Sequence, residues 1–110
     1  MTAPATVLPC RPVASVPLAV TVEIRALDTG TRLSRAFRVT REIDESTIRF
    51  ERDLPFEPGR PVSAELTLPD DAEPIVVTGV AAKAAIAIRS VDADARRRIA
   101  AYVTERTRIP

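Results

Sequence analysis

The chain has 110 residues, of which 45% are hydrophobic and 28% charged, with no histidine and one cysteine. This length leaves room for one domain, and the composition is that of a globular protein. Without histidine, neither a Ser-His-Asp nor a Cys-His nucleophile can form, and a zinc site built from cysteine and histidine is excluded as well. We therefore expect no enzyme, no metal site and no cofactor.

The charges nearly balance. Sixteen basic residues, fifteen of them arginine, face fifteen acidic ones, which gives a net charge of +1. Nucleic-acid-binding proteins usually carry a strong positive excess on one face. Aromatic side chains make up only 4% of the chain and offer few platforms on which bases could stack. We therefore expect no nucleic-acid partner.

No apolar run approaches the length of a membrane span. The first residues lack the basic region and the long apolar stretch of a signal peptide, and the single cysteine, Cys10, does not point to an oxidising compartment. These features predict a cytoplasmic protein without membrane insertion, and we expect a monomer or a small homo-oligomer.

The N-terminal part divides into an arm and the start of a domain. Residues 1–12 hold three of the ten prolines and show little periodicity, so we expect a flexible arm there and one domain over 13–110. From Val16 to Arg25, apolar and polar residues alternate, which predicts a strand with one buried face. Asp28-Thr29-Gly30 then predicts a hairpin turn.

A second strand is expected over about residues 32–41, with Leu33, Phe37 and Val39 on the face toward the core. Arg35 and Arg41 fall on the same face, so its two ends cannot both be dry. Glu42 to Ser46 is a polar connection. Further strands are expected over about 48–51, 62–68, 75–82 and 84–89. Apolar residues then recur at helical spacing over about 91–106, with Ser90 or Asp92 as the cap. The sequence thus predicts a mostly β protein, a six-stranded antiparallel β-barrel with a C-terminal α-helix, because closing the sheet removes its edges.

Several segments, in this order, resemble a PilZ domain: Val16–Val22, Arg38–Phe50, Leu54–Val62, Leu66–Pro69, Thr78–Val80 and Ala95–Val103. PilZ domains are six-stranded β-barrels with a C-terminal helix. The resemblance also implies a function, because the family is known as bacterial receptors for cyclic di-GMP, a signal in motility and biofilm control.

The family binds this ligand through two motifs, R-x-x-x-R before the first strand and D/N-x-S-x-x-G at the turn into the third. Arginine recognises phosphate groups and guanine edges through paired hydrogen bonds. In this chain Arg11 begins the first motif, and Ser15 replaces its second arginine. Asp44 and Ser46 begin the second motif, and Arg49 stands where its glycine is expected. An alignment on the following strand places Thr47 at the glycine instead.

Each of these residues has two interpretations. The resemblance implies that Arg11 contacts a phosphate, but it is otherwise a solvated side chain in the arm. Asp44 and Ser46 either read a guanine or bond to their own backbone in a tight turn, as both residue types commonly do. Arg35 or Arg41 would replace the missing arginine if its side chain reaches the same site.

Two functions follow from the resemblance. The first is a single-domain regulatory adaptor in bacterial cyclic di-GMP signalling, of the motility or biofilm type, whose ligand binding is weak or lost because both motifs are incomplete. The alternative is an interaction module that binds an unknown protein partner without nucleotide, for example in type IV pilus function.

Overall fold

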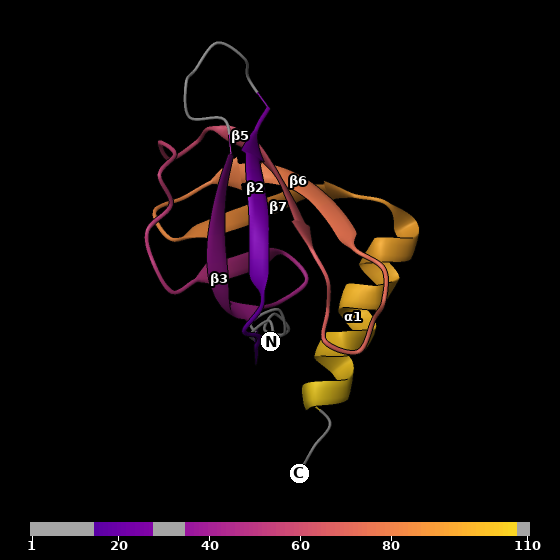
Figure 1. Cartoon of the computed structure of the whole chain (residues 1–110). Coiled ribbons are helices and arrows are strands. Elements are labelled where there is room, and N and C mark those ends of the chain that lie inside the picture. The colour runs from indigo at the N-terminus through magenta and orange to yellow at the C-terminus, as the bar shows by residue number, and fades with distance from the viewer. Residues whose placement is uncertain (1–14, 28–34, 108–110) are drawn as a thin grey trace, which may run out of the picture.

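The structure of the chain is a computed structural model in which residues 15–27 and 35–107 are described. The arm predicted over 1–12, with Arg11, the hairpin turn at 28–30 and Leu33 lie outside the described residues. The described residues form seven strands and one helix (Figure 1), namely β1 (Val16–Pro17), β2 (Thr21–Ala26), β3 (Arg35–Ile43), β4 (Thr47–Phe50), β5 (Pro61–Leu66), β6 (Ile75–Ala81), β7 (Ala85–Val91) and α1 (Ala93–Thr107).

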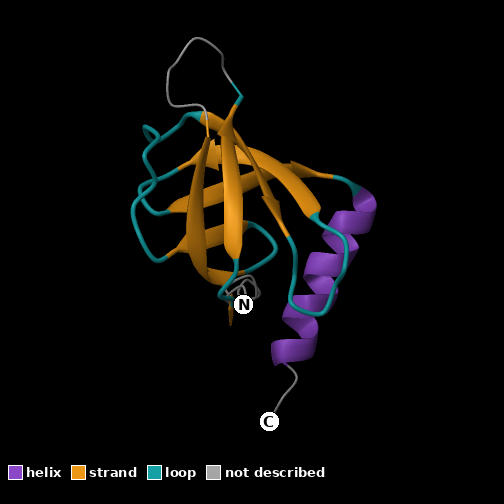
Figure 2. Cartoon of the chain, in the orientation of Figure 1, coloured by secondary structure: helices purple, strands orange, loops and turns teal. Residues whose placement is uncertain are grey.

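Six of the strands close into an antiparallel barrel. Their order is β3-β2-β5-β6-β7-β4, and β4 returns to pair with β3, while the short β1 extends the sheet beside β3. The predicted six-stranded barrel with a C-terminal helix is therefore confirmed, with β1 as one extra strand. Figure 2 shows the strands wrapped around a common interior, with α1 lying along one side.

The interior is filled by the alternating aliphatic side chains of the strands. The largest of these that are fully buried are Ile24, Ile43, Ile48, Leu66, Ile75 and Ile86. The helix buries Ala95, Ile99, Tyr102 and Val103, which recur at helical spacing. Asp92 caps α1 as predicted, because its carboxylate accepts a hydrogen bond of 2.7 Å from the backbone N–H of Ala95.

The strand predicted from Val16 to Arg25 is divided. Val16 pairs with Ile43, whereas Thr21 pairs with Val39, so the register slips by one residue between β1 and β2. Thr40, fully buried on β3, fastens the irregular stretch. Its hydroxyl accepts a hydrogen bond of 2.9 Å from the N–H of Val20 and donates one of 2.5 Å to the carbonyl of Leu18.

The predicted orientation of β3 is wrong. Phe37 and Val39, expected toward the core, are 54% and 40% exposed. They stand opposite Glu23 and Thr21 on the outer face of the β2–β3 pair. The reason is a bulge between Thr40 and Glu42, because an extra residue changes which side chains point inward along a strand. Thr40 and Ile43 face the interior instead.

The three consecutive arginines at the start of α1 differ among themselves. Arg96 and Arg97 are exposed, but Arg98 binds the connection between β5 and β6. Its guanidinium lies 3.0 Å from the Asp71 carboxylate and donates a 2.6 Å hydrogen bond to the carbonyl of Glu73. The helix is thus held against the barrel by polar as well as apolar contacts.

Within the described part of the chain, no helix could span a bilayer.

Candidate functional site

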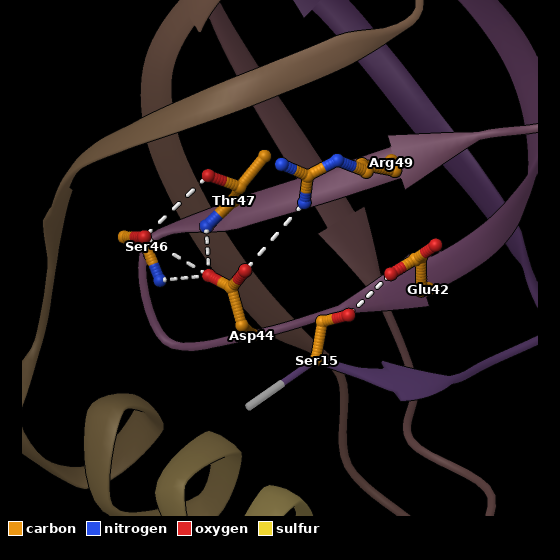
Figure 3. Close-up of polar contacts among 6 residues, drawn as sticks. All are labelled: Ser15, Glu42, Asp44, Ser46, Thr47 and Arg49. Atoms are coloured by element: carbon orange, nitrogen blue, oxygen red, sulfur yellow. Dashed lines mark hydrogen bonds and ion pairs between the residues drawn. The ribbon is translucent and has the colours of Figure 1, made fainter. Parts of the chain in front are cut away.

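The structure brings Ser15, at the last position of the first motif, next to the second motif at one end of β3. Because Val16 pairs with Ile43, the residues that precede and follow this pair, Ser15 and Asp44, come side by side. We call this region the motif corner; its residues are Ser15, Glu42, Asp44, Ser46, Thr47 and Arg49 (Figure 3). Of the site residues predicted from the sequence that the structure describes, all except Arg35 and Arg41 belong to the motif corner.

Asp44 is engaged in the turn that it begins. The side chain is only 6% exposed. Its Oδ1 accepts three hydrogen bonds, from the N–H of Ser46 at 2.7 Å, from the hydroxyl of Ser46 at 2.9 Å and from the N–H of Thr47 at 2.8 Å. The backbone N–H of Asp44 also donates to the Thr47 carbonyl at 3.0 Å. This is the turn chemistry of an aspartate that satisfies its own loop, and it uses one of the two carboxylate oxygens.

The second oxygen of Asp44 faces Arg49. Oδ2 lies 3.5 Å from a guanidinium nitrogen of Arg49, which is half exposed on β4. Arg49 pairs with Glu42 across β3 and β4, so its side chain emerges between two carboxylates. A guanidinium held in this way has fewer donors available for a phosphate group than a free one.

Glu42 is a residue of the corner that the sequence reasoning missed. The hydroxyl of Ser15, in the position where the family has an arginine, donates a short hydrogen bond to the Glu42 carboxylate. An anionic ligand at this position would meet Glu42 and Asp44, and like charges repel each other. The signal that could have found Glu42 is its place two residues before Asp44, but the bulge at Arg41 conceals which side of β3 it occupies.

The two arginines proposed as replacements lie at different distances from the corner. Arg35 begins β3, at the end opposite Ile43, so an extended strand places it roughly 25 Å away. It lies 3.5 Å from the Glu23 carboxylate and stacks over the Phe37 ring at 5.7 Å from the ring centre. Arg41 is exposed on the bulge, two residues before Ile43. The fold therefore brings Arg41, and not Arg35, toward the corner.

A solved structure has the same fold. It is that of the Bacillus subtilis inhibitor of motility (MotI/DgrA), with a TM-score of 0.68 and 14% sequence identity over 88% of this chain and 50% of that one. The chain thus spans about half the length of that protein. No protein-family model matches the sequence, and no curated protein matches it either. The similarity is therefore one of fold.

The carboxylates of the described residues do not gather into a metal site. In residues 15–27 and 35–107, no group of three or more cysteine, histidine, aspartate or glutamate side chains is placed to hold a metal ion. The carboxylates of the corner instead contact hydroxyl, amide and guanidinium groups of the same corner.

Proposed function

We propose that this chain is a cytoplasmic PilZ-like regulatory adaptor of bacterial cyclic di-GMP signalling, of the type that acts on motility, and that its affinity for cyclic di-GMP is weak or lost. The sequence resemblance, the barrel with its C-terminal helix and the fold shared with an inhibitor of motility support this proposal. The observation that carries it is the motif corner, where Ser15 and Asp44 lie side by side but bind neighbouring groups of the chain.

The weak affinity follows from the chemistry of the corner. Cyclic di-GMP carries two phosphates, and Ser15 provides no positive charge where the motif requires one. Losing the hydrogen bonds of an arginine to a phosphate costs about 1.5–3 kcal/mol, which is roughly ten- to a hundredfold in affinity. Glu42 adds a negative charge at the same place.

A second candidate function is an interaction module that acts without nucleotide, for example in type IV pilus function. The contacts of Ser15 with Glu42 and of Asp44 with Arg49 favour it, because they satisfy the polar groups of the corner from within the chain. Such a corner is stable without a ligand.

Motility assays with a deletion strain separate the two functions. We expect deletion to change swimming or surface motility, and the wild-type chain supplied in trans to restore it. For a cyclic di-GMP adaptor, strongly raising the nucleotide with an expressed diguanylate cyclase changes the effect of the chain. For a nucleotide-independent module, the effect is the same at low and high nucleotide. Unchanged motility in the deletion strain at both levels would contradict both functions.

A further inference from the structure

The outer face of β2 and β3 carries apolar side chains that no part of the described structure covers. Phe37 and Val39 lie two residues apart on β3, and both side chains are exposed on its outer face. They help to line a groove, whose residues are Thr21, Phe37, Arg38, Val39, Glu51 and Arg52. We call this groove and its rim the Phe37 surface. Contiguous exposed apolar side chains rimmed by polar ones mark interaction sites.

Positive charge surrounds this surface. Its rim has five arginines and three glutamates, namely Arg25, Arg35, Arg38, Arg41, Arg52, Glu23, Glu51 and Glu65, the last of which pairs with Glu23 across β2 and β5. One glutamate, Glu23, is already shared by Arg25 at 2.8 Å and Arg35 at 3.5 Å. Because the whole chain has a net charge of only +1, the positive excess here is a local feature of the surface.

Two of these arginines, Arg35 and Arg38, are held in place by contacts with Phe37. Arg35 stacks over the Phe37 ring, and Arg38 donates hydrogen bonds to the carbonyls of Asp53 at 3.1 Å and Phe37 at 2.8 Å. No ion pair of Arg52 is found among the described residues. Aromatic and arginine side chains in such settings dominate the binding energy of protein interfaces.

Three other occupants of the surface are a second copy of the chain, its own residues 1–14 and an added strand, and charge or strand pairing argues against each of them. A second copy that placed its own Phe37 surface on this one would bring arginines against arginines, which is repulsive. Residues 1–14 contain one arginine and no acidic residue, so they do not complement the surface either. Addition of a strand is also excluded, because β2 and β3 both pair with strands on each side.

We propose that the Phe37 surface binds an acidic segment of another protein, which places an apolar side chain against Phe37 and Val39 and its carboxylates beside the arginines of the rim. The proposal rests on the proposed adaptor function and adds to it the binding surface and the chemistry of the partner. The surface lies along β2 and β3, whereas the motif corner lies at the end of β3.

Photo-crosslinking in the native cell tests this proposal. A photoreactive amino acid is placed at Val39 of the full chain, and in separate strains at Val76 and at Arg49. Val76 is the matched control, because it is an apolar side chain, 50% exposed, on the outer face of β6. We expect crosslinks from position 39 to a different protein, through a segment with more acidic than basic residues, and none from position 76.

Two charge reversals complete the test. Arg52→Glu should lower the crosslinking yield from position 39 about tenfold, because it places like charges in the interface. Arg97→Glu, on the exposed side of α1, should leave the yield unchanged, and equal melting temperatures show that both variants fold. Crosslinks to a basic segment or to a second copy, or a yield unaffected by Arg52→Glu, would overturn the proposal.

The three positions also separate this proposal from the adaptor function on which it rests. Crosslinks to a protein only from Arg49 or Val76 would leave the adaptor function standing and refute the Phe37 surface. If none of the three positions gives a crosslink, the Phe37 surface is refuted, and the motility of the deletion strain decides the adaptor function separately.

Discussion

Gly79→Ala is expected to destabilise the barrel strongly, because the added methyl group has no room between β6 and β7. A Cβ atom at Gly79 would lie 2.0 Å from the carbonyl oxygen of Ala87 and 2.9 Å from its carbonyl carbon. Both are backbone atoms. Gly79 pairs with Val62 on one side and with Ile88 on the other, so β6 cannot move away from either neighbour without breaking pairs of the closed sheet.

Overpacking a core usually costs about 1–3 kcal/mol, and more where the backbone must move. We therefore expect Gly79→Ala to lower the free energy of unfolding by about 3 kcal/mol or more, out of the roughly 5–15 kcal/mol typical of a domain. Urea and thermal unfolding, followed by circular dichroism, measure this change.

Gly59→Ala is the matched control. Gly59 has a φ of +92°, and a Cβ there would meet nothing within 4 Å. Its replacement brings only the strain of a left-handed conformation, about 1–2 kcal/mol. If Gly79→Ala unfolds at the same urea concentration as the wild type or as Gly59→Ala, the close approach of β6 and β7 where their register shifts between Thr78 and Gly79 is wrong.

Asp44→Ala is expected to have the second largest effect. The substitution removes the acceptor of two backbone N–H groups, those of Ser46 and Thr47, in a turn where the carboxylate is almost fully buried. Leaving a buried donor without its partner costs about 1–3 kcal/mol. Because these two donors are only partly buried, we expect their combined loss to lower the free energy of unfolding by about 2–4 kcal/mol, in the lower part of the range for two buried donors. Thermal unfolding gives the value directly.

Two further variants show which contact of Asp44 is responsible. Asp44→Asn keeps a carbonyl oxygen that can accept the same hydrogen bonds, and it should cost less than about 1 kcal/mol. Arg49→Ala removes the ion pair at 3.5 Å with a half-exposed partner, and such pairs contribute about 0–1 kcal/mol. An Asp44→Asn or Arg49→Ala variant as unstable as Asp44→Ala would mean that the ion pair, and not the turn, makes Asp44 important.

The alternation of apolar and polar residues, together with the turn residues between the alternating segments, was enough to predict the strands and the closure of the sheet into a barrel. Val22 and Ile24 alternate with polar residues and are buried as expected, and Asp92 caps the helix. Three irregularities could not be predicted, namely the register slip between β1 and β2, the bulge at Arg41 and the register shift between β6 and β7 at Gly79. A bulge adds one residue on one strand only. In β3 it cannot be recognised from the hydrophobic pattern, because the inward residue before it is the polar Thr40, whereas the apolar Phe37 and Val39 point outward.

The same bulge limits what the sequence could say about function. The motif spacing placed Asp44 and Ser46 at a turn, and the structure has them there. Neither Glu42 beside Ser15 nor the outward position of Phe37 could be predicted, because each depends on the phase of β3 on one side of the bulge. The features that argue against nucleotide binding and for a protein partner thus both arise from one irregular residue.

The central claim is that the motif corner is closed by its own contacts and binds cyclic di-GMP weakly at most. Calorimetric titration at physiological salt, with the wild type and the double variant Ser15→Arg, Glu42→Gln side by side, tests it most directly. The variant restores the arginine and removes the opposing carboxylate, so we predict weak or no binding by the wild type and an affinity roughly ten- to a hundredfold higher in the variant. A wild-type dissociation constant of about 1 μM or tighter, which corresponds to about 8 kcal/mol of binding free energy, would contradict the claim, and so would a variant that binds no better than the wild type.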